Sequence, residues 1–332
     1  MFKKTFFIIK TLSTQVTIYF RMIKNYKKLA RRKNLSFYIF SIPPIGFFLY
    51  LISKIIIKSK NRYLANLFFD IFVFKSIIRF LSPEEKTFIS EILKSYNLLS
   101  LNEIKKINPD NEINMKVLNL KNNGYCNLGK IFSDQECDNF IKILNGKDCF
   151  NSQTPMQSDG NLLKFDPTKD IFSKSNYSYF SFLPEITLSF LPIKNFLNDK
   201  NLVTIIKSYL NFESEIYSCV TWYNPKSKKA HYVHRLHRDP DDFKFLTMII
   251  YWNKTDQSNG CVSYLKKSHN STVSEEKKDF LTGPKGQVYL ADLFGLHAGG
   301  KILDKYRYVT YIRFGKLHNH ASTIDAFVTT PV

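Results

Sequence analysis

Two histidines and one aspartate have the residue types and the spacing of a metal site. His237 and Asp239 lie two positions apart in the stretch HRLHRDPDD, and His297 follows about 60 residues later in GQVYLADLFGLHAGG. Two imidazoles and one carboxylate, with further coordination positions left open, are the ligands that suit non-haem Fe(II). An isolated His-x-Asp pair is also typical of a solvated charged turn, so the elements that position these residues decide between the two interpretations.

Five short runs of β-branched and aromatic residues surround the three candidate ligands. They cover residues 215–222, 245–252, 261–265, 286–293 and 307–314. Turn-forming residues bound each run, which is typical of β-strands. No long helical pattern separates them, so a parallel sheet of βαβ units is disfavoured and an antiparallel barrel or jelly roll is predicted. The His-x-Asp pair falls between the first two predicted strands and His297 follows the fourth, so a barrel can place all three side chains on one side of a metal.

Helices are predicted before these strands. The sequence SPEE at residues 82–85 is a capping box with proline at the first helical position, and SDQE at residues 133–136 opens a second capped helix. Apolar residues recur at helical spacing after each box. Up to Leu210 we expect helices and loops, and the polar stretch over residues 97–114 is predicted to precede the main domain.

Two longer stretches contain these features in a recognisable order. HRLHRDPDDFKFLTMIIYWNKTDQSNGCVSYLKKSHN contains the His-x-Asp pair, two strands, an Asn-Gly turn and a Ser-His pair. GPKGQVYLADLFGLHAGGKILDKYRYVTYIRFG leads through a strand to the distal histidine and to an arginine about ten residues later. This order resembles the phytanoyl-CoA dioxygenase-like family of Fe(II)/2-oxoglutarate-dependent oxygenases, and NLKNNGYCNLGKIFSDQECDNFI resembles the family's first strand and capped helix. The resemblance covers residues 116–316 and implies a mainly β fold with flanking helices, with a double-stranded β-helix (cupin-like jelly roll) as its core.

The resemblance implies a role for four residues. His237, Asp239 and His297 would be the iron ligands and the catalytic centre, and Arg307 would bind the distal carboxylate of 2-oxoglutarate. Arginine suits that carboxylate because its planar fork donates two hydrogen bonds and stays charged when buried. Arg313, six residues further on the same face of the predicted strand, is the second choice for this role.

The resemblance also implies the cofactors and the reaction. The cofactors would be Fe(II), 2-oxoglutarate as cosubstrate and O2, and the reaction would hydroxylate a small-molecule or lipid-like substrate with release of succinate and CO2. Asp239 occupies the position that related halogenases leave without a carboxylate so that chloride can bind iron, which disfavours halogenation. Some relatives carry a hydroxyl residue two positions after the arginine, where this chain has Val309, so the rest of the 2-oxoglutarate site is not predicted. The alternative is a non-catalytic jelly-roll protein that binds a ligand or a partner at a membrane surface.

The other histidines are His231, His234, His269, His318 and His320. On a helix, the first two could join His237 in a zinc cluster because all three are spaced by three residues. Pro225 and Pro240 disfavour a helix in this segment. The remaining three histidines are assigned no role: His269 is expected to lie in a turn after a strand, and the other two lie in the C-terminal tail.

Positive charge is concentrated in the N-terminal quarter of the chain. The net charge is +20, and residues 1–80 hold 16 Lys and Arg against one acidic residue, Asp70. These cations alternate with Phe, Ile, Leu and Tyr, a pattern more typical of a segment on an anionic lipid surface than of a nucleic-acid-binding segment. A solvated helical face is the third interpretation.

Residues 35–53 carry no charge and are just long enough to span a bilayer. Pro43, Pro44 and Gly46 lie in their middle, where they would remove helical hydrogen bonds that lipid cannot replace. A transmembrane span, a re-entrant hairpin and an interfacial segment therefore all stay open.

Four regions are predicted along the chain. Residues 1–80 form a basic, apolar, membrane-associated or helical region, residues 81–114 a capped helix and linker, residues 115–320 the oxygenase jelly roll and residues 321–332 a tail. The five cysteines are an odd number without a CxxC pair, which favours a reducing compartment and thiols that serve as small core residues. We expect a cytoplasmic location, at the inner face of a membrane if residues 1–80 bind lipid.

Overall fold

The computed structural model describes residues 43–68, 77–78, 81–95, 111–152, 162–173, 179–226, 232–239, 241–242, 244–271, 278–315 and 327–331. The chain divides into two compact units, Met1–Leu98 and Leu99–Val332. The finer boundaries at residues 80, 114 and 320 stay predictions.

The described part of the N-terminal unit contains α3 (Pro43–Ser59), α4 (Arg62–Phe68) and α6 (Pro83–Ser95). The predicted capping box of α6 is confirmed, because the Glu85 N–H donates to Ser82 Oγ at 3.2 Å and the Ser82 N–H donates to Glu85 Oε2 at 2.9 Å. Pro83 takes the first helical position, where an N–H would have no acceptor within the helix.

Within the described residues, Pro43 and Pro44 are the first two residues of α3, so neither proline lies in the interior of this helix as described. Prolines are tolerated in a first helical turn because the first four N–H groups of a helix have no intrahelical acceptor. The helix then continues through Gly46. Residues 35–42 lie outside the described residues, and a span or a hairpin over residues 35–53 stays a prediction. No helix in the described part of the chain has both the length and the apolar character to cross a membrane.

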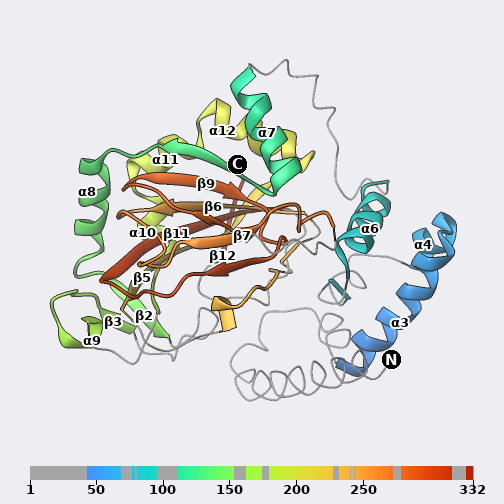
Figure 1. Ribbon diagram of the computed structural model, residues 1–332, viewed down its shortest axis with the longest axis horizontal. Helices are drawn as coiled ribbons and strands as arrows, with labels where there is room; N and C mark the ends of the chain where they lie inside the picture. The colour runs from blue at the N-terminus through green and yellow to red at the C-terminus, as the bar shows by residue number, and fades with distance from the viewer. Residues whose placement is uncertain are drawn as a thin grey trace. The chain divides into compact units, whose positions relative to one another are not determined.

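The strands of the C-terminal unit form two antiparallel sheets (Figure 1). The larger sheet contains β1 (Tyr125–Lys130), β2 (Asp148–Ser152), β3 (Leu162–Lys164), β4 (Tyr179–Phe182), β5 (Glu215–Pro225), β6 (Leu246–Tyr251), β9 (Gln287–Ala291), β11 (Tyr306–Gly315) and β12 (Phe327–Pro331). Its order is β1-β9-β6-β11-β5-β4-β2-β3, with β12 also paired to β5. The smaller sheet has the order β10-β7-β8, formed by β7 (Val262–Leu265), β8 (Lys278–Leu281) and β10 (His297–Gly299). The predicted jelly-roll class and the five predicted strands are confirmed.

Strands also occur before Leu210, where we expected only helices and loops after the first strand. β4, β2 and β3 extend the large sheet beyond β5. β3 has only three residues, and β2 ends in the polar pair Asn151 and Ser152, so neither shows the sustained alternation that predicts a strand. Pairing of β2 with β4 and β3 gives this segment an extended structure that its own composition does not indicate.

Helices flank the sheets: α7 (Asn111–Asn123), α8 (Asp134–Leu144), α9 (Asp170–Ser173), α10 (Pro184–Leu188), α11 (Leu191–Leu197) and α12 (Lys200–Leu210). The predicted cap of α8 is confirmed, with Ser133 and Glu136 forming both hydrogen bonds of a capping box. The buried residues of α8, among them Phe140, face the sheet, since the Phe140 ring lies 4.1 Å from the ring of Trp252.

One face of the large sheet packs against the small sheet, and we call it the inner face. Its residues include Ile249 and Tyr251 of β6 and Val309 and Tyr311 of β11, which share one buried cluster with side chains of β7 and β8. Side chains alternate along a strand, so Arg307 and Arg313 also lie on the inner face of β11. The inner face therefore carries both of the arginines that were predicted as candidates for the cosubstrate.

Candidate functional site

A backbone bridge brings the candidate ligands together. The His237 N–H donates to His297 O at 2.9 Å, and the His297 N–H donates to His237 O at 3.0 Å. His297 begins β10, which pairs with β7 through Tyr264. The Asp239 N–H donates to Leu293 O at 2.9 Å. Backbone hydrogen bonds of His237 and Asp239 thus join the loop between β5 and β6 to the segment around His297.

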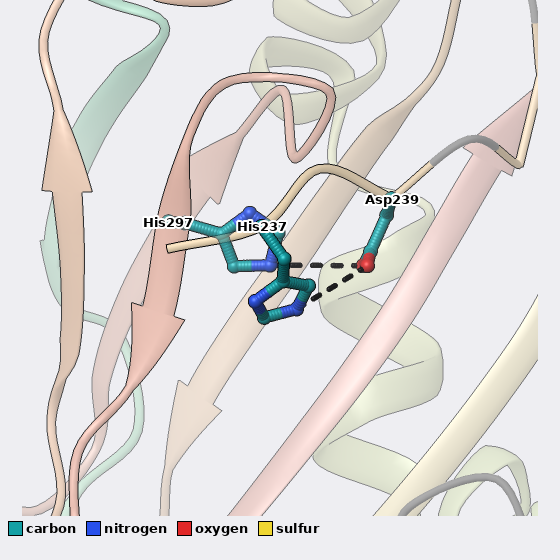
Figure 2. A group of neighbouring side chains, drawn as sticks. All are labelled: His237, Asp239 and His297. Carbon is teal, nitrogen blue, oxygen red and sulfur yellow. Dashed lines mark ion pairs between the residues drawn. The ribbon is translucent and has the colours of Figure 1, made fainter. Parts of the chain in front are cut away.

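The three side chains point toward one another (Figure 2). One ligand atom of each residue lies within 4.8 Å of the others. His237 Nε2 is 3.6 Å from Asp239 Oδ1, and His297 Nε2 is 3.8 Å from Asp239 Oδ2. The His297 side chain is 7% exposed and that of His237 is 22% exposed, so His237 borders solvent while His297 is enclosed.

In each imidazole, Nε2 faces the site and Nδ1 contacts a backbone carbonyl oxygen that holds the ring in place. His237 Nδ1 lies 2.9 Å from the Arg235 carbonyl oxygen, and His297 Nδ1 lies 3.0 Å from that of Gly295. A carbonyl oxygen only accepts, so in the neutral ring Nδ1 carries the proton and Nε2 presents its lone pair to the site. Burial lowers the pKa of His297 to about 4, which keeps this ring neutral at pH 7. The two rings are therefore oriented as metal donors by hydrogen bonds that do not involve the metal.

Arg313 holds the carboxylate of Asp239. Its Nη2 donates to Asp239 Oδ2 at 3.0 Å and its Nη1 donates to Asp241. The Tyr217 hydroxyl donates to Asp241 at 3.3 Å. Burial opposes ionisation of Asp239, but the Arg313 guanidinium and the two histidines outweigh it and lower the pKa of Asp239. Asp239 is thus an oriented anion, and the donor set of two imidazoles and one carboxylate fits Fe(II).

Arg307 lies six residues before Arg313 on the inner face of β11 and is only 4% exposed. Its Nε and Nη2 donate to Asn224 Oδ1 at 3.2 and 3.0 Å, and its Nη1 donates to the Gly260 carbonyl. Gly260 has a φ of +86°, and an added Cβ would meet Ile302 at 2.3 Å, so this carbonyl position requires glycine. All of these acceptors are neutral, and no residue that the structure describes forms an ion pair with Arg307.

The other described histidines do not belong to the group of His237, Asp239 and His297. His269 Nε2 is 3.1 Å from Lys121 O, and the residue follows β7 in a turn, as expected. His234 ends the 3-10 helix η2 (Tyr232–His234), whereas His237 is bridged to His297, so the predicted alternative of a helical zinc cluster is wrong. His231, His318 and His320 lie outside the described residues.

Sequence reasoning missed the residues that position the two arginines. Asp241 follows Asp239 at the same spacing that separates Asp239 from His237, and this repeat was a usable signal for a second carboxylate in the site. Asn224 is opposite Arg307 in the pairing of β5 with β11. That register depends on the folded sheet, and no local pattern around Asn224 shows it.

A jelly roll that presents two histidines and a carboxylate to a metal, with a buried arginine free of any carboxylate partner among the described residues, defines the class of iron- and 2-oxoglutarate-dependent oxygenases. The family model described as phytanoyl-CoA dioxygenase (PhyH) matches residues 120–292, slightly more than half of the chain. The chain belongs to this family, and the predicted resemblance is confirmed. The matched segment contains His237 and Asp239 and ends before His297.

Three solved structures with a similar fold are distant from this chain in sequence. The alpha-ketoglutarate-dependent non-haem epimerase SnoN from nogalamycin biosynthesis is 9% identical with a TM-score of 0.45, over 61% of this chain and 82% of that chain. HygX from Streptomyces hygroscopicus, with nickel, 2-oxoglutarate and hygromycin B bound, is 11% identical with a TM-score of 0.45, over 60% and 86%. EctD from S. alaskensis, with 2-oxoglutarate and 5-hydroxyectoine, is 19% identical with a TM-score of 0.42, over 60% and 75%. No curated protein matches the chain. The family assignment rests on the PhyH match.

Proposed function

We propose that this protein is a hydroxylase that uses His237, Asp239 and His297 to bind Fe(II) and Arg307 to bind 2-oxoglutarate. The observation that carries the proposal is the convergence of the three ligand atoms within 4.8 Å, with both Nδ1 atoms already held by carbonyl oxygens. A histidine with a purely structural role does not require a second histidine and a carboxylate within that distance. The arrangement is that of a preorganised metal site.

Arg307 supports 2-oxoglutarate as the cosubstrate. Among the described residues, Arg307 has only neutral oxygens as partners, so its guanidinium keeps its full positive charge, and burying such a charge is costly unless an anion accompanies it. A dicarboxylic acid that binds the metal through its 2-oxo acid end has a second carboxylate for this purpose. Arg313 is a weaker candidate because Asp239 and Asp241 already accept its hydrogen bonds.

Bound iron and 2-oxoglutarate would supply the activation of O2, and the chain's own residues would orient both. Arg313 fixes Asp239, the Arg235 and Gly295 carbonyls fix the imidazoles, and the partly exposed His237 leaves that side of the site to the substrate. The presence of Asp239 as a carboxylate ligand favours hydroxylation over halogenation. The family's description names phytanoyl-CoA, an acyl thioester, which supports a lipid-like or other small-molecule substrate.

A location at the cytoplasmic face of a membrane is part of the same proposal. On α3 the exposed apolar residues Phe48, Leu51 and Ile55 recur at helical spacing and are 63%, 45% and 70% exposed. The exposed residues Lys58 and Lys60 follow them. An apolar stripe beside lysines suits the surface of an anionic bilayer.

The proposed function is tested by anaerobic titration and by turnover. Fe(II) followed by 2-oxoglutarate should give the metal-to-ligand charge-transfer band of the chelated 2-oxo acid, and admission of O2 should then release succinate slowly without substrate. A matched sample with Zn(II) should give neither signal. A protein that binds both components but forms no succinate would support the non-catalytic alternative, and absence of the band would refute the proposed function.

A further inference from the structure

Trp222 lies on the inner face of the large sheet, two residues along β5 from Asn224, which pairs with Arg307. In the pairing of β5 with β11, Asn224 is opposite Arg307 and Trp222 is opposite Val309. Residues two positions apart on a strand share a face and are separated by roughly 7 Å. The Trp222 ring packs against Tyr311 at 5.0 Å and edge-on against Tyr179 at 5.2 Å.

The indole N–H of Trp222 is buried and has no acceptor among the residues that the structure describes. The second tryptophan differs, because the Trp252 Nε1–H donates to Thr310 Oγ1 at 2.8 Å. A buried donor without an acceptor is destabilising and is rare in folded proteins. A ligand that brings an acceptor to the inner face would remove this cost.

Two further buried polar atoms without a partner lie on the same face. They are Thr247 Oγ1 of β6 and Arg313 Nε of β11, which are opposite each other in the pairing of these strands. Three of the five such atoms in the described part of the chain therefore lie on the inner face, Trp222 near the Arg307 end of β11 and the other two near Asp239. This concentration indicates that the inner face is built to enclose a polar molecule.

Arg307 still has donors to offer at this place. A guanidinium carries five N–H groups, and three of those of Arg307 donate to Asn224 and Gly260. One N–H on each terminal nitrogen is left for a carboxylate, and each carboxylate oxygen accepts more than one hydrogen bond. A carboxylate bound by Arg307 thus retains acceptor capacity for a donor one strand position away.

We propose that the Trp222 Nε1–H donates to the distal carboxylate of 2-oxoglutarate that Arg307 binds. This inference rests on the proposed function. Trp222 would then bind the cosubstrate as well as pack against Tyr311 and Tyr179. The proposal also accounts for the absence of a hydroxyl side chain at Val309, because the indole N–H of Trp222, opposite Val309, would be the second donor to the carboxylate.

The chain contains only two tryptophans, so the indole N–H groups can be followed individually. Protein labelled with 15N-tryptophan and loaded with diamagnetic Zn(II) should show two indole cross-peaks, and the spectrum of Trp222→Phe assigns them. On titration with 2-oxoglutarate, the Trp222 peak should move downfield and its exchange with water should slow, while the Trp252 peak stays in place. Pyruvate, which has no distal carboxylate, should leave the Trp222 peak unmoved.

Affinity gives a second, independent readout. Trp222→Phe keeps an aromatic ring and removes the N–H donor, so it should raise the 2-oxoglutarate concentration needed for half of the charge-transfer band by about 10-fold or more, as expected for a hydrogen bond to a charged group. Fe(II) affinity should stay at the wild-type value. An unmoved Trp222 peak in protein that binds 2-oxoglutarate overturns the inference and leaves the proposed function intact. If wild-type protein binds no 2-oxoglutarate at all, both are refuted. If Trp222→Phe does not fold, the spectrum of Trp252→Phe supplies the assignment, and the titration of wild-type protein still decides the matter.

Discussion

Arg307 and Arg313 lie on the same face of β11, but the side chains and carbonyls around them differ in charge. Two carboxylates, those of Asp239 and Asp241, accept from Arg313. They raise the pKa of Arg313 although burial opposes this. In the part of the chain that the structure describes, Arg307 donates only to neutral oxygens, those of Asn224 and Gly260. This difference favours Arg307 as the residue that meets the cosubstrate and Arg313 as the residue that orients the metal-binding carboxylate.

We predict that Arg307→Ala weakens 2-oxoglutarate binding strongly while leaving Fe(II) binding in place. Loss of one partner of a buried charge pair typically costs about 2 to 5 kcal/mol, which corresponds to an affinity lower by about 30-fold or more. Arg307→Lys should recover only part of the loss, since an ammonium cannot form two parallel hydrogen bonds to a carboxylate. The measurement is the 2-oxoglutarate concentration at half of the anaerobic charge-transfer band. Arg313→Ala is the matched variant at saturating Fe(II), and if it rather than Arg307→Ala lost 2-oxoglutarate binding, the two roles would be reversed.

We also predict that His297→Ala and Asp239→Ala each greatly weaken Fe(II) binding. Each removes one of three donors, and His297 is the most enclosed of them. His269→Ala is the matched control, because His269 is buried in the same domain but contacts Lys121 and Asn270 away from the three ligands. Anaerobic Fe(II) titration gives the affinities, and circular dichroism confirms that each variant is folded. Wild-type affinity in His297→Ala would show that the ligand set is wrong.

The sequence was sufficient to find the three candidate ligands but not the residues that hold them in place. A His-x-Asp pair and a later histidine can be recognised because their spacing and flanking strands are local features. The contact between Arg313 and Asp239 joins residues 74 positions apart and depends on how the loop between β5 and β6 folds over β11. The resemblance ranked Arg307 before Arg313, and the structure adds the different hydrogen-bond partners of the two side chains.

At the scale of elements, a row of buried hydroxyl groups joins the large sheet to α10. Thr187 of α10, Thr221 of β5 and Thr310 of β11 are linked by hydroxyl contacts of 2.7 and 2.6 Å. Thr310 also accepts from the Trp252 indole. This row lies on the face opposite to the ligands and aligns β5, β11 and α10.

We predict that Thr310→Val destabilises the protein by about 1 to 3 kcal/mol, because it leaves the buried Trp252 N–H without its acceptor while preserving the side-chain shape. Urea unfolding followed by tryptophan fluorescence measures the change. Thr204→Val on α12 is the control, since its hydroxyl donates to the Lys200 carbonyl on an exposed surface, and such substitutions typically change stability by less than about 0.5 kcal/mol. Equal stability of the two variants would contradict a structural role for the hydroxyl row.

The strands that follow Leu210 could be predicted because each is dense in β-branched and aromatic residues, as in LTMIIY of β6. β2 and β3 could not be predicted from the sequence, because they are short and partly polar and become strands only through pairing. The start of α3 shows a different limit. Pro43 and Pro44 break a helix in its interior but suit its first turn, and their sequence alone does not say which position they take.

Over the whole molecule, most of the net positive charge lies in residues 1–80 and little of it in the rest of the chain. Residues 1–80 carry 16 cations against one anion, and the remainder carries 32 against 27. The excess lies outside the segment that matches the PhyH family. The five cysteines are all free and buried in the C-terminal unit, which confirms that they are core residues. The excess charge thus lies in a part of the sequence other than the one that holds the candidate metal ligands.

We predict that residues 1–80 attach the protein to anionic membranes and are dispensable for 2-oxoglutarate turnover. Deleting them should move the protein from the membrane fraction to the soluble fraction, because the cations and the exposed stripe of α3 are lost together. The matched variant replaces Phe48, Leu51 and Ile55 by Ser and keeps every charge, so it separates the apolar contribution from the electrostatic one. Sedimentation with liposomes that contain acidic lipid measures both. Release of the full-length protein by high salt would indicate surface binding, and resistance to salt would indicate insertion of residues 35–53. A full-length protein that stays in the supernatant with acidic liposomes at low salt would show that the N-terminal quarter has another function.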